Sequence, residues 1–132
     1  MGPDGVTLLL DTHALLWWAT LDPRLSRKAK RAIADEAGTV FVSAASAWEI
    51  ATKARLGKLT WPADAGSVHA YTVGQGFRGL PVSLEHAERA GRLAIANRDP
   101  FDRMLIAQAQ TEDLMLVSNE AGFDAAGVRR YW

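Results

Sequence analysis

The chain of 132 residues contains no cysteine. This absence excludes disulfides, thiolate zinc sites, iron–sulfur clusters and cysteine nucleophiles, and it fits a reducing compartment. A long apolar run is also absent, because the early apolar segment 6–10 is far shorter than the roughly 20 residues that a membrane span needs. We therefore expect a cytoplasmic protein that has no secretory signal and does not associate with a membrane.

An excess of charge of one sign is absent as well, since 15 basic residues balance 15 acidic ones. This balance argues against a protein that holds nucleic acid through its overall charge, but it allows a local basic rim around an acidic centre. Hydrophobic residues make up 48% of the chain, which is enough to bury a core. We expect a single domain over residues 1–132, in which residues 1–5 form a flexible N-terminus.

Short apolar segments alternate with helical patterns along the chain. Strands are predicted at residues 6–10, 39–42, 79–82, 114–117 and near 128–131. Helices are predicted at residues 14–19, 26–36, 43–55 or 46–55, 62–75, 84–96 and from 99 onward. The alternation predicts an α/β fold, a three-layer α/β/α sandwich with a central parallel sheet of four or five strands.

Three polar residues are expected to cap helices at their N-termini, namely Ser26, Ser83 and Asp99. The third helix is expected to begin at either Ser43 or Ser46, since both serines precede its apolar pattern.

Four acidic residues stand where a parallel sheet would bring them to one edge. Asp11 directly follows the first strand, and Glu120 follows the fourth by a few residues. Glu49 lies early in the helix after the second strand, and Asp102 lies in the first turn of the helix before the fourth. Ligands of open parallel sheets bind at the carboxyl ends of the strands. The spacing therefore predicts a shared acidic site.

Clustered carboxylates repel one another unless a cation lies among them. Oxygen ligands without cysteine or histidine suit Mg²⁺ or Mn²⁺. Two such ions spaced about 4 Å apart can activate a water and stabilise the leaving oxygen in phosphodiester cleavage.

Each acid also has a purely structural interpretation. Asp11 could cap the following helix, Ser46 and Glu49 match a capping box, and Glu49 with Lys53 matches a surface ion pair. Asp102 suits a helix start, and Glu120 could be an ordinary loop acid. The functional interpretation depends on all four meeting at one edge.

Four segments carry a resemblance to a known family. They are LLLDTHALLWW (8–18), VSAASAWEIATKARLGKL (42–59), RDPFDRMLIAQAQTEDLMLVSNEAGF (98–123) and GVRRYW (127–132). Together they make the chain resemble the PIN-domain ribonucleases of the VapC toxin type over nearly its whole length. The resemblance implies a metal-dependent endoribonuclease that leaves a 5′-phosphate and a 3′-hydroxyl. It also implies a homodimer and inactivation by a small cognate antitoxin.

Position by position, Asp11, Glu49 and Asp102 match the first three acids of the family's site, and Glu120 stands where Asp is commoner. The resemblance implies that Asp11, Asp102 and Glu120 are metal ligands. Ser118 matches a Ser or Thr near the metal. Asn97 stands where close relatives often carry histidine, and the sequence suggests no role for this change.

Basic residues occur in two places of interest. Arg98 and Arg103 flank Asp102, so we expect both either to contact the phosphate of an RNA substrate or to pair with the site acids when metal is absent. A second set covers one face of the helix predicted at 26–36, and it consists of Arg27, Lys28, Lys30 and Arg31. Such a face is usually a solvated helix side, and contact with RNA is the less favoured interpretation.

Two other functions are compatible with parts of the pattern. A phosphohydrolase of the haloacid-dehalogenase type would use Asp11 as a nucleophile, but it needs a second Asp at the position of His13 and leaves Glu49 unexplained. A degenerate PIN scaffold that acts as a binding module is the other alternative. The presence of all four acids argues against it.

Overall fold

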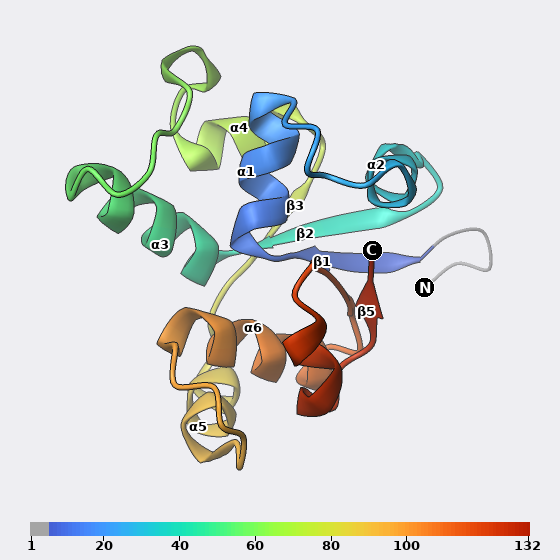
Figure 1. The fold of residues 1–132 in the computed structure, drawn as a ribbon, viewed down its shortest axis with the longest axis vertical. Helices are drawn as coiled ribbons and strands as arrows, with labels where there is room; N and C mark the ends of the chain where they lie inside the picture. The colour runs from blue at the N-terminus through green and yellow to red at the C-terminus, as the bar shows by residue number, and fades with distance from the viewer. Residues whose placement is uncertain (1–5) are drawn as a thin grey trace.

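A parallel sheet of five strands forms the centre of the molecule, in the order β3-β2-β1-β4-β5 (Figure 1). The computed structural model describes residues 6–132, so the expectation of a flexible segment 1–5 lies outside the described residues. The strands are β1 (Thr7–Leu10), β2 (Thr39–Ser43), β3 (Arg78–Leu80), β4 (Met115–Val117) and β5 (Arg130–Tyr131). All four strand pairs are parallel.

Helices cover both faces of this sheet, which confirms the three-layer prediction (Figure 1). One layer contains α1 (Thr12–Thr20), α2 (Arg27–Ala34), α3 (Ala44–Arg55), the short 3-10 helix η1 (Ala63–Ala65) and α4 (Val68–Gly74). The other contains α5 (Leu84–Arg92), α6 (Pro100–Thr111) and the 3-10 helix η2 (Ala121–Ala126). Within residues 6–132, no helix is both long and apolar enough to cross a membrane.

The central strand β1 divides the core into two parts. Its side chains alternate between the faces of the sheet, so Leu8 and Leu10 pack with α1 and α2 while Leu9 packs with α6. All three leucines are buried because helices cover both faces. This buried strand ends directly at Asp11.

Side-chain caps start most of the helices, as the sequence predicts. The Ser26 hydroxyl accepts from the Ala29 amide at 3.0 Å, and the Ser83 hydroxyl accepts from the His86 amide at 3.0 Å. Helix α3 is capped by Ser43, which accepts from the Ala45 amide at 3.0 Å. The alternative start at Ser46 was wrong, and Ser46 is a buried residue inside the helix.

Two predicted helices differ from the observed ones. The helix predicted at 84–96 ends at Arg92, because the Arg103 guanidinium takes the carbonyls of Ala90 and Leu93 that a longer helix would use. The helix predicted at 62–75 is divided into η1 and α4 by Gly66, whose φ of 74° is incompatible with a right-handed helix.

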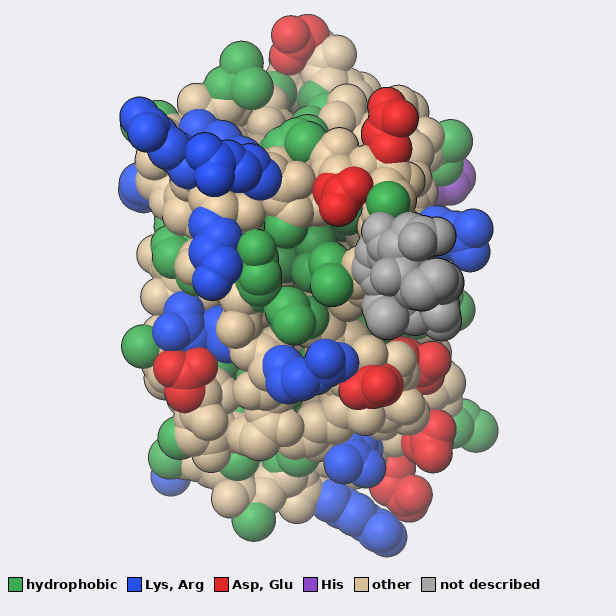
Figure 2. Space-filling model, turned by 90° about the vertical axis from the view of Figure 1, so that its right-hand side faces the viewer, with side chains coloured by type: hydrophobic (Ala, Val, Ile, Leu, Met, Phe, Trp, Pro, Cys, Tyr) green, Lys and Arg blue, Asp and Glu red, His purple; other side chains and the backbone are tan. Residues whose placement is uncertain are grey.

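The basic face of α2 lies away from the helices that carry the acids. Figure 1 places α2 beside the start of β2, while α3 and α6 lie at the opposite side of the view. The Lys28 ammonium packs over the ring of Tyr131 at 4.5 Å. Figure 2 shows the face at the right of Figure 1, where basic and acidic side chains are interspersed around an apolar centre. We therefore keep the interpretation of a solvated helix face.

Candidate active site

Asp11 lies where β1 ends and α1 begins. Its amide donates to the Val117 carbonyl at 3.0 Å, and its carboxylate accepts from the Ala14 amide at 2.7 Å as the cap of α1. The side chain is buried, and burial raises the pKa of Asp11. Hydrogen bonds from Ser118 and Ala14 oppose this shift, whereas the charge of Glu120 adds to it. The capping role is therefore real, but it does not remove the cost of the buried charge.

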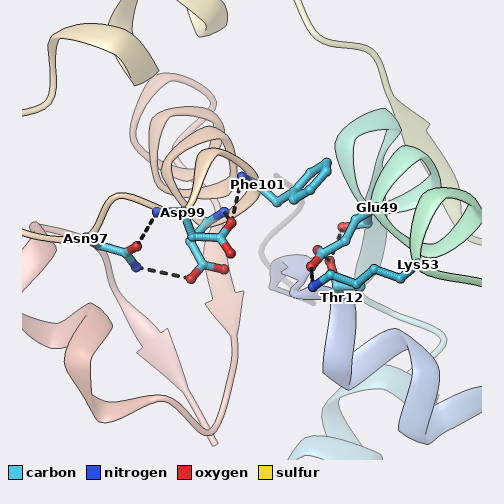
Figure 3. Close-up of polar contacts among 8 residues, drawn as sticks. Thr12, Glu49, Lys53, Asn97, Asp99 and Phe101 are labelled. Atoms are coloured by element: carbon cyan, nitrogen blue, oxygen red, sulfur yellow. Dashed lines mark hydrogen bonds and ion pairs between the residues drawn. The ribbon is translucent and has the colours of Figure 1, made fainter. Parts of the chain in front are cut away.

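Glu49 projects from α3 toward the start of α1. It is buried, and its Oε1 accepts a hydrogen bond of 2.6 Å from the Thr12 hydroxyl (Figure 3). Its other oxygen pairs with the ammonium of Lys53 one turn later. The pKa of Lys53 is raised first by its hydrogen bond with Glu49 and further by the charges of Asp99 and Asp102. The Lys53 ammonium thus faces acids from both α3 and α6, and this pair is more than a surface contact.

Asp102 lies in the first turn of α6, where the helix dipole favours an acid. The cap of this helix is Asp99, which accepts from the Asp102 amide at 3.1 Å. The Asn97 side-chain amide donates to the Asp102 carboxylate at 3.1 Å. The pKa of Asp102 is raised to about 6, chiefly by burial. The hydrogen bond from Asn97 opposes this rise, and the charges of Asp99, Glu120 and Glu49 contribute to it.

Glu120 is the exposed member of the set, at the start of η2 just beyond β4. Its amide donates to the Ser118 hydroxyl at 3.0 Å. The negative charge of Glu120 raises the pKa of both Asp11 and Asp102, so its carboxylate lies within electrostatic reach of both. Ser118 itself is buried and contacts both Asp11 and Glu120, which gives it a supporting place in the site.

The four acids therefore meet at the carboxyl edge of the sheet, although they do not touch. Figure 3 shows Asn97 and Asp99 facing Thr12, Glu49 and Lys53 from opposite sides. Within residues 6–132, no three acidic or histidine side chains are close enough to form a ready metal cage. The donor set still fits a hard divalent cation, because it offers only oxygen ligands, two of its acids have raised pKa values, and an ammonium already partly compensates their charge.

The two arginines beside Asp102 differ in their surroundings. Arg98 is exposed. The Arg103 guanidinium donates to the backbone carbonyls of the segment after α5, namely those of Ala90, Gly91, Leu93 and Asn97. Arg103 thus holds the segment that carries Asn97 and Asp99, so of these two arginines Arg98 alone remains available as a contact for phosphate.

Two contributors were missed by sequence reasoning. Thr12 supplies the hydrogen bond to Glu49, and the only signal for it was its place directly after Asp11. Asn97 orients Asp102 and accepts from the Asp99 amide at 2.9 Å, and its position just before the Arg98–Asp102 segment was the available signal.

A family model for the PIN domain matches residues 8–128, a segment that contains all four acids. The chain belongs to the PIN domain family. Among curated proteins, none matches its sequence.

Solved structures of several proteins share the fold of this PIN domain. A DNA-bound VapBC from Salmonella typhimurium superposes with a TM-score of 0.72 at 19% identity, covering 96% of this chain and 97% of that one. VapBC2 from Rickettsia felis, bound to a DNA fragment of its promoter, gives 0.67 at 14% identity and covers 96% and 98%. VapC20 of Mycobacterium tuberculosis, a toxin that cleaves the sarcin–ricin loop, gives 0.55 at 19% identity and covers 92% and 95%.

Proposed function

We propose that this PIN domain is an endoribonuclease that depends on Mg²⁺ or Mn²⁺ and acts as the toxin of a toxin–antitoxin pair. The main support is the convergence of Asp11, Asp102 and Glu120 at the carboxyl edge of the sheet, where burial and the charge of Glu120 raise the pKa values of both aspartates. An arrangement that destabilises its own carboxylates is expected where a cation binds during function. The choice of RNA rests on the similarity to a toxin that cleaves the sarcin–ricin loop.

In this proposal the carboxylates of Asp11, Asp102 and Glu120 would hold the cation, with the Ser118 hydroxyl beside Asp11. When bound, the cation supplies a Lewis acid that neutralises negative charge and makes water more acidic.

Glu49, fixed by Thr12, accepts the proton of the attacking water, and the exposed Arg98 contacts the phosphate. Attack on phosphorus breaks its bond to the 3′-oxygen, so the products carry a 5′-phosphate and a 3′-hydroxyl.

The test is cleavage of a mixed RNA pool, with sequencing of the new 5′ ends, by the wild type and by Asp11→Asn. Asparagine keeps an oxygen that can accept from the Ala14 amide, so the cap of α1 persists while the charge is lost. We expect the variant to lose metal-dependent cleavage and to remain folded by circular dichroism. Full activity in Asp11→Asn would refute the shared site.

A phosphohydrolase that uses Asp11 as a nucleophile has less support. The position two residues later is occupied by His13, whose side chain is exposed, and such a mechanism assigns no role to the contact between Thr12 and Glu49. Mass spectrometry of the protein after reaction distinguishes the two mechanisms, because only the phosphohydrolase forms a covalent phosphate on Asp11.

We also propose a protein antitoxin as the partner of this chain. The similar Salmonella and Rickettsia structures are of VapBC, and the surface offers an apolar hollow of about 560 Å³ between α1, α2 and α4. Trp17, Trp18, Leu21 and Tyr71 are among its lining residues. If a short reading frame lies just upstream of the gene, its product is expected to bind the chain and stop RNA cleavage.

A further inference from the structure

Two aromatic side chains pack against each other at the edge of the acidic site. Trp48 directly precedes Glu49 on α3, and Phe101 directly precedes Asp102 on α6. The ring centroids lie 5.0 Å apart and the ring planes meet at 71°. Figure 3 shows the Phe101 ring extending from α6 toward α3, in the space between the two helices that carry these acids. The pair therefore bridges the two sides of the site.

Trp48 is not a core residue. Its side chain is 65% exposed, and it is the only aromatic among the strongly exposed large hydrophobic residues of the described segment 6–132. Neighbouring residues of a helix point about 100° apart, so the buried direction of Glu49 turns Trp48 outward. Because Trp48 is 65% exposed, most of its aromatic surface stays open to solvent despite the edge-to-face contact with Phe101.

A nucleobase of single-stranded RNA fits this open face. The chain has no net charge, so overall electrostatics cannot supply much affinity for RNA. Stacking of a base on an aromatic ring adds binding free energy whichever base is stacked. The Lys53 ammonium faces acids of α3 and α6, and the exposed Arg98 is close to Asp99 and Asp102 in sequence. Both can contact the phosphates on either side of a stacked base.

A second copy of the chain is a poorer occupant of this surface. Trp48, which is 65% exposed, and the half-buried Phe101 together expose at most roughly 240 Å² of apolar surface, well below the approximately 800 Å² per partner that a stable dimer buries. The α3 positions that share the face of Trp48 include Ala44 and Ala51, whose small side chains add little area.

We propose that Trp48, supported by Phe101, is a stacking platform for a nucleobase next to the phosphodiester that is cut. The proposal deepens the proposed ribonuclease function and rests on it. Loss of one stacked base is expected to weaken RNA binding by roughly 5- to 150-fold. Because the platform contacts substrate but not the reacting atoms, its loss raises KM and leaves kcat largely unchanged.

The experiment measures binding and cleavage separately. Binding of a fluorescent single-stranded RNA is followed by anisotropy in the non-cleaving Asp11→Asn background, and cleavage is measured with Asp11 intact. Trp48→Ala is compared with Trp48→Phe, which keeps a stacking ring, and with Leu84→Ala, which removes a 91% exposed side chain on α5. We expect weaker binding and a raised KM for Trp48→Ala only, with near wild-type values for the other two.

Each other result has a definite meaning. Unchanged binding and KM in Trp48→Ala, with RNA still cleaved by the wild type, overturns the platform alone. A change of oligomeric state in Trp48→Ala, seen by light scattering, assigns the ring to a second copy and also overturns it. If the wild type cleaves no RNA but binding still depends on Trp48, the ring does bind a nucleobase, but the proposed ribonuclease function and the position of the platform beside a cleaved phosphodiester both fail.

Discussion

Replacing Asp102 by asparagine tests whether the acidic site is a source of instability in the metal-free protein. The folded state raises the pKa of Asp102 from 3.8 to about 6, which corresponds to about 3 kcal/mol for ionising it there. Removing the charge should stabilise the fold by less than this amount. Solvent screens the charge of this partly exposed side chain, and the variant also loses the favourable interaction with the helix dipole. Asparagine retains an oxygen for the Asn97 amide. We therefore expect Asp102→Asn to be about 1–2 kcal/mol more stable at pH 8 in EDTA.

The sign of the pH dependence follows from the raised pKa. Below the unfolded value of 3.8 the carboxyl is protonated in both states and costs nothing, whereas above about 6 it is ionised in both and the full cost applies. Wild-type stability should therefore fall as pH rises between these limits. The variant should lack this fall, so its advantage should vanish near pH 4.

Thermal unfolding in EDTA at pH 4 and at pH 8 measures the effect. A gain of 1–2 kcal/mol corresponds to a Tm increase of about 4–8 °C for a chain of this length. Added Mg²⁺ or Mn²⁺ should raise the Tm of the wild type more than that of the variant. A variant that is less stable at pH 8, or whose shift is equal at both pH values, would contradict the electrostatic account and favour a helix-start role for Asp102.

Two further predictions concern residues around Asp102. Arg103→Met should lose at least about 2 kcal/mol of stability in urea unfolding, because it removes charged donors from buried carbonyls, while the exposed Arg98→Met should change it by less than about 0.5 kcal/mol. Equal effects of the two substitutions would contradict the assigned role of Arg103. Asn97→Ala removes a hydrogen bond that lowers the pKa of Asp102, so the acid limb of the pH–cleavage profile should move to higher pH. An unmoved limb would show that Asn97 does not act on Asp102.

Local signals in the sequence predicted much of the fold. The strand pattern before Asp11 and the caps Ser26, Ser83 and Asp99 depend on neighbouring residues, and the structure confirms them. Where the sequence offered two caps for α3, local rules could not choose, because Ser43 and Ser46 both precede the same apolar pattern. The end of α5 was missed since Arg103, which takes its carbonyls, lies 13 residues from Ala90.

The positions of the acids could be predicted from the sequence, but their hydrogen-bond partners could not. Parallel strands bring their carboxyl ends together, so the positions of Asp11 and Glu49 after β1 and β2 were informative. The hydrogen bond from Thr12 to Glu49 joins residues 37 positions apart. Which side chain reaches across such a separation depends on packing between α1 and α3, and no local pattern records it.

The position of Arg103 beside Asp102 has a consequence for genetics. If the proposed toxin function holds, a selection for harmless alleles should recover substitutions at Arg103 as readily as substitutions of the acids. The two kinds of allele would look alike on a plate, because one loses the chemistry and the other loses the segment that carries Asn97 and Asp99. Immunoblotting separates them, since the Arg103 alleles should accumulate less protein while the acid alleles should accumulate as much as the wild type or more.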